Sequence, residues 1–257
     1  MIGAAADLLD LGQEVLFAGF AVFLRIGAAA ALMPAFGEQV VPVRVRLAGA
    51  LALTAIVAPA LAEDLRPAPA AGLAPLVLTE TVIGLSLGAV LRLLVMALQM
   101  AGAMAAQATS LAQIFGGQAA EPLPAIGHVL TVAGLALLAM SGLHLRLVEF
   151  LLLSYDLLPA GRLPRPDALL DWGLDRVQHA FNLAFVLAAP FVIASLLYNL
   201  TLGVINRAMP QLMVALVGAP AIAGGGLAIL ALTAPGILAA WIEAVAVFLA
   251  DPLSGRP

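Results

Sequence analysis

The chain has 257 residues, of which 63% are hydrophobic and only 10% are charged, and its mean hydropathy is +1.11. So few charged groups cannot cover the surface of a soluble domain, which indicates an integral membrane protein. The net charge of -4 excludes a basic surface for nucleic acid, and a chain without cysteine has no thiolate nucleophile, disulfide framework or iron–sulfur cluster.

Six apolar runs bounded by charged residues or proline determine the expected fold. An α-helix needs about 20 apolar residues to cross about 30 Å of hydrocarbon, and these runs are apolar on every face, unlike the alternating strands of a membrane barrel. We therefore predict an all-α integral membrane protein with about six hydrophobic helical segments, some of them broken or kinked. The runs are Val15 to Met33, Leu47 to Ala62, Leu73 to Ala106, Ile126 to Leu153, Val177 to Ile205 and Leu212 to Ala250.

Charged residues inside the first and third runs are expensive, because a charge at the bilayer centre costs at least about 2.5 to 3.5 kcal/mol. Arg25 lies in the first run, and Glu80 and Arg92 lie in the third. Glu80 and Arg92 are separated by about 18 Å of helical rise, so they cannot pair within one straight helix. We expect their partners on other helices or on other chains.

Small residues at four-residue spacing predict close helix packing in the third and fifth runs. Gly84 and Gly88 form a small-xxx-small pair, and around Gly203 two amides, Asn199 and Asn206, flank the glycine on one face.

Methionines at four-residue spacing mark the second half of the third run. Met96, Met100 and Met104 are either ordinary core filler or a deformable surface that lines a pore. A polar, glycine-containing stretch follows from Gln107, still inside the uncharged run. Irregular backbone at membrane depth is tolerated only when it is buried in protein or lines a water-filled cavity, which favours the pore alternative.

The polar connection of residues 154–178 separates the fourth and fifth runs. Leu170, Leu174, Val177 and Phe181 recur at helical spacing there, which predicts an amphipathic helix lying against a membrane or a partner. Carboxylates also recur every four residues in this stretch, and a solvated acidic face explains them better than a metal site does. We expect no metal, no cofactor and no catalytic residue, because nucleophile, metalloprotease and phosphate-loop motifs are all missing from the sequence.

The last run, Leu212 to Ala250, contains residues that loosen or kink a helix. Pro220, Gly224 to Gly226 and Pro235 predict a bent pair of half-helices. Such a broken helix is also the feature that would place a midplane site in a small-solute transporter. A transporter would further show an internal repeat between the two halves, and we find none.

An ordered set of residues through nearly the whole chain resembles one known family. The set comprises Arg25, Gly27, Ala28, Pro34, Phe36, Gly37, Val41 to Arg46, Glu80, Ile83, Gly84, Gly88, Arg92, Gln99, Gly102, Gln107, Gly142, His144, Asn199, Gly203, Arg207, Pro210, Gln211, Gly218 and Pro220. It resembles the FliR family of flagellar export proteins and its injectisome counterparts. The chain departs from the family pattern at Phe115-Gly116-Gly117, where a Phe-Asp-Pro turn is typical.

The resemblance implies a single domain over residues 1–257 that works as a non-enzymatic subunit of the type III export gate. The gate is a helical hetero-oligomer with FliP-type and FliQ-type subunits in the bacterial inner membrane at the flagellar basal body, beside FlhB-type and FlhA-type proteins. Unfolded export substrates pass through it, and the injectisome counterpart is the alternative. The surroundings of this chain are then partner subunits, membrane lipid and unfolded cargo, without nucleic acid.

The resemblance also implies roles for particular residues. The loop of residues 107–122 corresponds to a plug that helps to close the channel. The expected pore and plug residues are Met96, Met100, Met104, Gln107, Gln113, Phe115, Gly116 and Gly117. The expected subunit contacts are Arg25, Arg44, Arg46, Glu80, Gly84, Gly88, Arg92, Asn199, Gly203, Arg207 and Gln211.

Overall fold

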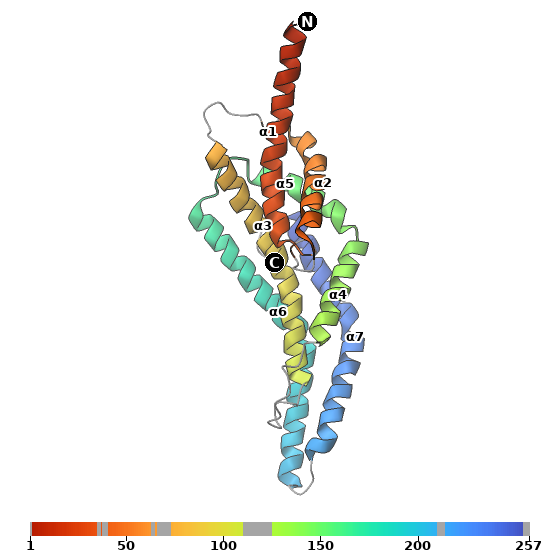
Figure 1. Cartoon of the computed structure of the whole chain (residues 1–257). Helices are drawn as coiled ribbons and strands as arrows, with labels where there is room; N and C mark the ends of the chain where they lie inside the picture. The colour runs from red at the N-terminus through yellow and green to blue at the C-terminus, as the bar shows by residue number, and fades with distance from the viewer. Residues whose placement is uncertain are drawn as a thin grey trace. The chain divides into compact units, whose positions relative to one another are not determined.

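The computed structural model describes residues 2–34, 37, 41–62, 65, 73–109, 125–209 and 214–253. Every regular element in these ranges is an α-helix (Figure 1). The helices are α1 (Ile2–Leu32), α2 (Val43–Leu61), α3 (Leu73–Thr109), α4 (Ala125–Met140), α5 (Leu143–Leu157), α6 (Pro166–Ala208) and α7 (Val214–Ala250). The prediction of an all-α fold is confirmed.

Five of these helices are long and apolar enough to cross a membrane, namely α1, α2, α3, α6 and α7. The pair α4 and α5 passes the same test when it is counted as one broken span, which brings the number to six. The predicted six hydrophobic segments are therefore confirmed, and the chain is an integral membrane protein.

The helix break lies in the fourth segment rather than in the last one. The run that was expected to be one helix is divided at Gly142, whose φ of 80° lies in the left-handed region that favours glycine. In contrast, α7 continues through Gly224–Gly226 and Pro235, so the prediction of two half-helices is wrong. Glycine lowers helix propensity without forbidding the helix, and transmembrane helices re-satisfy the backbone groups that a proline frees.

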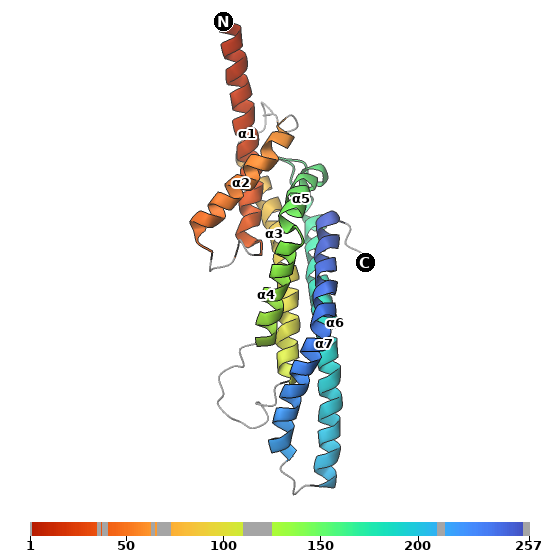
Figure 2. The same ribbon diagram turned by 90° about the vertical axis from the view of Figure 1, so that its right-hand side faces the viewer.

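The chain folds as two compact units. The first contains Met1–Leu93, Ala139–Val177 and Val247–Pro257, and the second contains Leu94–Leu138 and Gln178–Ala246. Helix α2 packs on α1 in the first unit, and α4 lies along the second half of α3 in the second unit (Figure 2).

Glycines of α3 allow a close approach to α1 within the first unit. A Cβ added at Gly84 would lie 2.2 Å from the backbone oxygen of Arg25, and one added at Gly88 would lie 2.4 Å from that of Ala29. Both distances are far below any contact that a real Cβ makes, so the backbones of α1 and α3 nearly touch. The prediction of tight helix packing at these two glycines is confirmed, and the contact is made inside the chain.

Replacing Gly84 by alanine is expected to lower the thermal unfolding temperature of the detergent-purified chain. The added methyl group must push α1 from α3, and overpacking of this kind costs about 1–3 kcal/mol. Gly19→Ala on α1 is the matched control, because nothing lies within 4 Å of its added Cβ. If the two variants unfold at the same temperature, the close approach of α1 and α3 is contradicted.

The second unit is organised around a buried tryptophan. Trp241 is fully buried, and its indole Nε1 donates a hydrogen bond of 2.7 Å to the backbone oxygen of Leu94. Gly134 of α4 lies against the same ring, where a Cβ would come within 2.9 Å of it. Helices α3, α4 and α7 are thereby held together around one side chain.

Candidate functional site

The second half of α3 presents a mixed face of methionine and glutamine to the outside of the chain. Met96 is 40% exposed, and Gln99 and Gln107 are also exposed. Met100 and Met104 are half-buried. None of the three methionines is fully enclosed, as filler of this chain's own core would be. Residues three and eight positions apart lie on one side of a helix, so Met96, Gln99 and Gln107 form one outward face.

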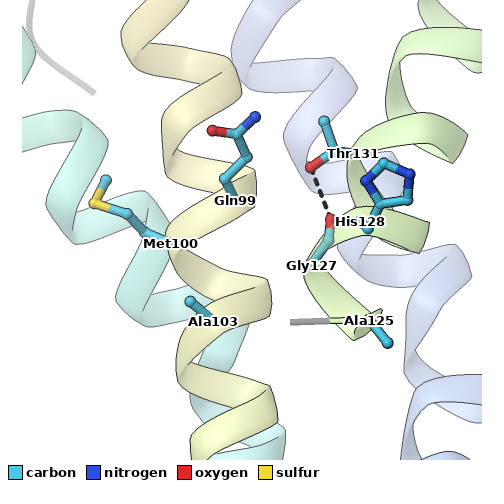
Figure 3. Close-up of a pocket in the computed structure, with 7 residues that line it drawn as sticks. All are labelled: Gln99, Met100, Ala103, Ala125, Gly127, His128 and Thr131. Atoms are coloured by element: carbon cyan, nitrogen blue, oxygen red, sulfur yellow. Dashed lines mark hydrogen bonds between the residues drawn. The ribbon is translucent and has the colours of Figure 1, made fainter. Parts of the chain in front are cut away.

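A cavity of about 700 Å³ lies beside this face, between α3 and α4 (Figure 3). Gln99, Met100 and Ala103 line it from α3, and Gly127, His128 and Thr131 line it from α4. The Thr131 hydroxyl donates to the backbone oxygen of Gly127 at 2.7 Å, so it is satisfied by its own helix. Gln99 and His128 are exposed and supply the polar character of the walls.

Two facing glycines set the separation of the cavity walls. A Cβ added at Gly102 would lie 2.1 Å from the Cα of Gly127. The backbones of α3 and α4 are therefore in direct contact at this crossing. Gln99 stands one turn before the crossing on α3, and His128 directly follows it on α4.

The chemistry of this wall suits water or polar groups better than lipid chains. An amide or imidazole that is moved from water to an apolar medium without a hydrogen-bond partner costs roughly 2–7 kcal/mol. Gln99 and His128 both lie on apolar helices and both are exposed in the isolated chain. We expect an aqueous path or a polar protein surface to cover them when the protein is in its native setting.

A second constellation, in the first unit, is closed off from solvent. Arg25 and Glu80 are both 0% exposed, and Arg25 Nε lies 2.8 Å from Glu80 Oε2. The guanidinium also donates to the backbone oxygens of Ser154 and Leu158, each at 2.8 Å, and its Cζ lies 3.6 Å from the centre of the Tyr155 ring. This arrangement satisfies a charge pair inside the protein, where an unpaired ion would be very costly.

The burial of this pair corrects part of the predicted subunit surface. The prediction that Arg25, Glu80, Gly84 and Gly88 contact partner subunits is wrong, because all four lie in the α1–α3 contact within this chain. The prediction that Glu80 finds its partner on another helix is confirmed. The glycines bring α1 close to α3, and this lets the arginine of one helix reach the carboxylate of the other.

Four residues of the buried network were missed by sequence reasoning. Leu158 and Gly161 contribute only backbone atoms, and because every residue has these atoms, the sequence does not show that they are used. Ser154 and Tyr155 interrupt an apolar run, and that interruption is the one signal by which they could have been found.

The other predicted contact residues that the structure describes are exposed or half-buried, so a partner can reach them. Arg44, Asn199, Gly203 and Arg207 are exposed, and Arg46 and Arg92 are half-buried. Their roles as subunit contacts stay predictions. Gln113, Phe115, Gly116, Gly117 and Gln211 lie outside the described residues, and residues 107–109 are the last residues of α3.

The connection of residues 154–178 contains the end of α5, an irregular stretch and the first turns of α6. The predicted helix is confirmed, although it is part of α6 and not a separate element. Leu170 and Leu174 are 63% and 59% exposed, so the apolar stripe faces outward. Among the described residues no group of three or more potential metal ligands is found.

The long apolar helices define a polytopic helical membrane protein, and the ion pair of Arg25 with Glu80 is buried among them. Residues 16–247 match the family described as bacterial export proteins, family 1. The chain is 33% identical to the flagellar biosynthetic protein FliR of Caulobacter vibrioides over 86% of this chain and 90% of that protein. It is 27% identical to the protein of the same name from Escherichia coli, with 82% of each chain covered, and 29% identical to that of Bacillus subtilis, with 77% and 79% covered. The chain therefore belongs to bacterial export proteins, family 1, the family of the FliR proteins.

Proposed function

We propose that this chain is a non-enzymatic subunit of the flagellar type III export gate in the bacterial inner membrane, at the flagellar basal body. It assembles with FliP-type and FliQ-type subunits, beside FlhB-type and FlhA-type proteins, and helps to form and close the channel for unfolded flagellar subunits. Family membership and the shared name of the curated relatives support this proposal.

The observation that carries the channel role is the exposed face of α3. Gln99 and Gln107 are exposed on a helix that is otherwise apolar, and Met96 lies on the same face. Amides of this kind fit a water-filled conduit, and flexible thioethers adapt to cargo of varied shape. The proposed plug, residues 107–122, begins in the last residues of α3, and its glycines lower the cost of rearrangement.

The transporter alternative loses its main support in the structure. The solute site was expected where the last segment breaks, and that break does not occur, since α7 continues through Gly224–Gly226; the broken segment is the α4–α5 pair at Gly142. The curated relatives compared above are flagellar proteins, which favours the flagellum over the injectisome.

Deleting residues 116–119 is expected to raise ion leakage through the complex co-expressed with its FliP-type and FliQ-type partners. Loss of plug residues should also open the α3 face to water. Because the chain contains no cysteine, Gln99→Cys is a unique thiol, and its reaction with a membrane-impermeant maleimide should be faster in the deletion variant than in the intact gate.

Leu163→Cys is the control, since this side chain is 47% exposed and lies in the polar connection between α5 and α6. Its labelling rate should be the same with and without the deletion. Unchanged leakage together with unchanged labelling of Gln99→Cys would contradict the plug and the channel face. Native mass spectrometry of the same preparation tests the assembly itself, which is rejected if the chain leaves the membrane as a lone monomer.

A further inference from the structure

The buried ion pair lies at the point where the chain leaves helix α5. The last four carbonyl groups of any α-helix have no partner within that helix. Helix α5 ends at Leu157, so Ser154 contributes the first of these four carbonyls. The Ser154 oxygen accepts the backbone N–H of Leu158 at 3.0 Å and one guanidinium nitrogen of Arg25 at 2.8 Å. The cation therefore sits at the end of the helix where the dipole favours positive charge.

The same guanidinium reaches beyond the end of the helix. Its second terminal nitrogen donates to the backbone oxygen of Leu158 at 2.8 Å. Arg25 therefore spans two carbonyls of the departing chain and still donates from Nε to Glu80. Only a planar group with several fixed donors can make these three contacts together.

Glu80 completes the turn from the other side. Its Oε2 accepts from Arg25, and its Oε1 accepts the backbone N–H of Gly161 at 3.0 Å. Gly161 has a φ of 72°, a conformation that side chains other than glycine rarely adopt. The carboxylate therefore holds the residue at which the backbone turns toward α6.

We propose that Arg25 and Glu80 are positioning residues that cap α5 and hold the turn of residues 158–161, through which the chain enters α6. In this arrangement each residue type is required by the backbone groups that it meets. Attraction between the two charges would survive an exchange of their positions. The backbone contacts would not, because carbonyl oxygens need the arginine and the Gly161 N–H needs the carboxylate. This inference does not depend on the proposed export function.

Hydrogen exchange of the full chain in detergent, read at Gly161, tests the proposal with three variants. Glu80→Leu removes the acceptor, and the exchanged pair Arg25→Glu with Glu80→Arg puts each group at the wrong backbone atoms. Both should speed exchange of the Gly161 amide about tenfold, the loss expected for a hydrogen bond to a charged group. Glu80→Gln leaves one acceptor oxygen, and the amide nitrogen in place of the other oxygen is a donor. Because the guanidinium takes the remaining oxygen, the Gly161 amide should exchange faster in this variant as well.

Two outcomes overturn the proposal. If the exchanged pair protects Gly161 as the native pair does, attraction between the charges explains the network. If Glu80→Gln protects Gly161 as the native carboxylate does, the turn does not need both oxygens of Glu80, and the two-sided arrangement is contradicted.

A measurement in membranes covers variants that do not survive purification. Leu158→Cys is a half-buried probe on the turn, and Leu163→Cys is an exposed probe of the same connection outside the network. Maleimide should label the first probe faster in the Glu80→Leu background and the second at the same rate in every background. Failure of the exchanged pair to accumulate while Glu80→Gln accumulates supports the proposal. Accumulation of the exchanged pair at the native level, with native labelling of Leu158→Cys, contradicts it.

Discussion

Replacing Arg25 by leucine is expected to remove most of the folded protein from the membrane. The substitution leaves the carboxylate of Glu80 buried without its cation, and breaking a buried pair in this way costs about 3–5 kcal/mol. Native proteins are stable by only about 5–15 kcal/mol, so a large share of the stability is lost. Quantitative immunoblotting of membranes and thermal unfolding of the purified chain measure the effect.

Arg44→Leu is the matched control, because Arg44 is exposed at the start of α2 and makes no contact with the buried network. The unfolding temperature of the isolated chain should not change in this variant, and a role in assembly would show only as reduced co-purification of partners. The double variant Arg25→Leu with Glu80→Leu should recover part of the lost stability, because it removes the unpaired charge while the turn loses its caps. Equal unfolding temperatures for Arg25→Leu and Arg44→Leu would contradict the buried pair.

Replacing Gly102 by valine is expected to separate α3 from α4. A Cβ at this position would lie 2.1 Å from the Cα of Gly127, whereas non-bonded carbon atoms rest at about 3.5–4.0 Å. The branched side chain adds further volume, so we expect a loss of about 3 kcal/mol, at the upper end of the usual range for overpacking. The wider crossing also moves Gln99 away from His128, which should change the labelling rate of Gln99→Cys.

Gly236→Val provides the comparison for this second prediction. Gly236 lies in α7, and nothing lies within 4 Å of an added Cβ there. Its substitution changes glycine to a β-branched residue within a helix without a steric conflict, so its effect on unfolding should be small. A Gly102→Val variant as stable as Gly236→Val would show that α3 and α4 do not meet at Gly127.

The helices were predictable because the length and apolarity of each run, read along a single stretch of sequence, are enough to predict a membrane-spanning helix. The third run was expected from Leu73 to Ala106, and α3 covers Leu73–Thr109. The break at Gly142 was not predictable in the same way, since glycine occurs both inside helices and at their interruptions. Gly224–Gly226 shows the opposite outcome with the same residue type, because this stretch stays helical.

The site was predictable only where a single helix carries it. The face of α3 with Met96 and Gln107 follows from spacing along one element, and the structure places these side chains outward. The partner of Glu80 lies 55 residues away on α1, and its other contact is a backbone amide. Contacts between distant segments depend on how the helices pack, and a sequence read along one helix does not contain that information.

The left-handed backbone at Gly142 has a consequence for mapping the chain with reporter fusions. Helices α4 and α5, with 16 and 15 residues, extend for roughly 24 and 22 Å, so neither alone reaches through about 30 Å of hydrocarbon. If the pair crosses the membrane once, the chain has six crossings, an even number, and α1 starts on the same side of the bilayer as α7 ends. If the pair is a re-entrant hairpin, the chain has five crossings, an odd number, and α1 starts on the side opposite to the end of α7. Reporters fused after residues 124 and 165 measure this parity directly, and hydropathy alone does not supply it.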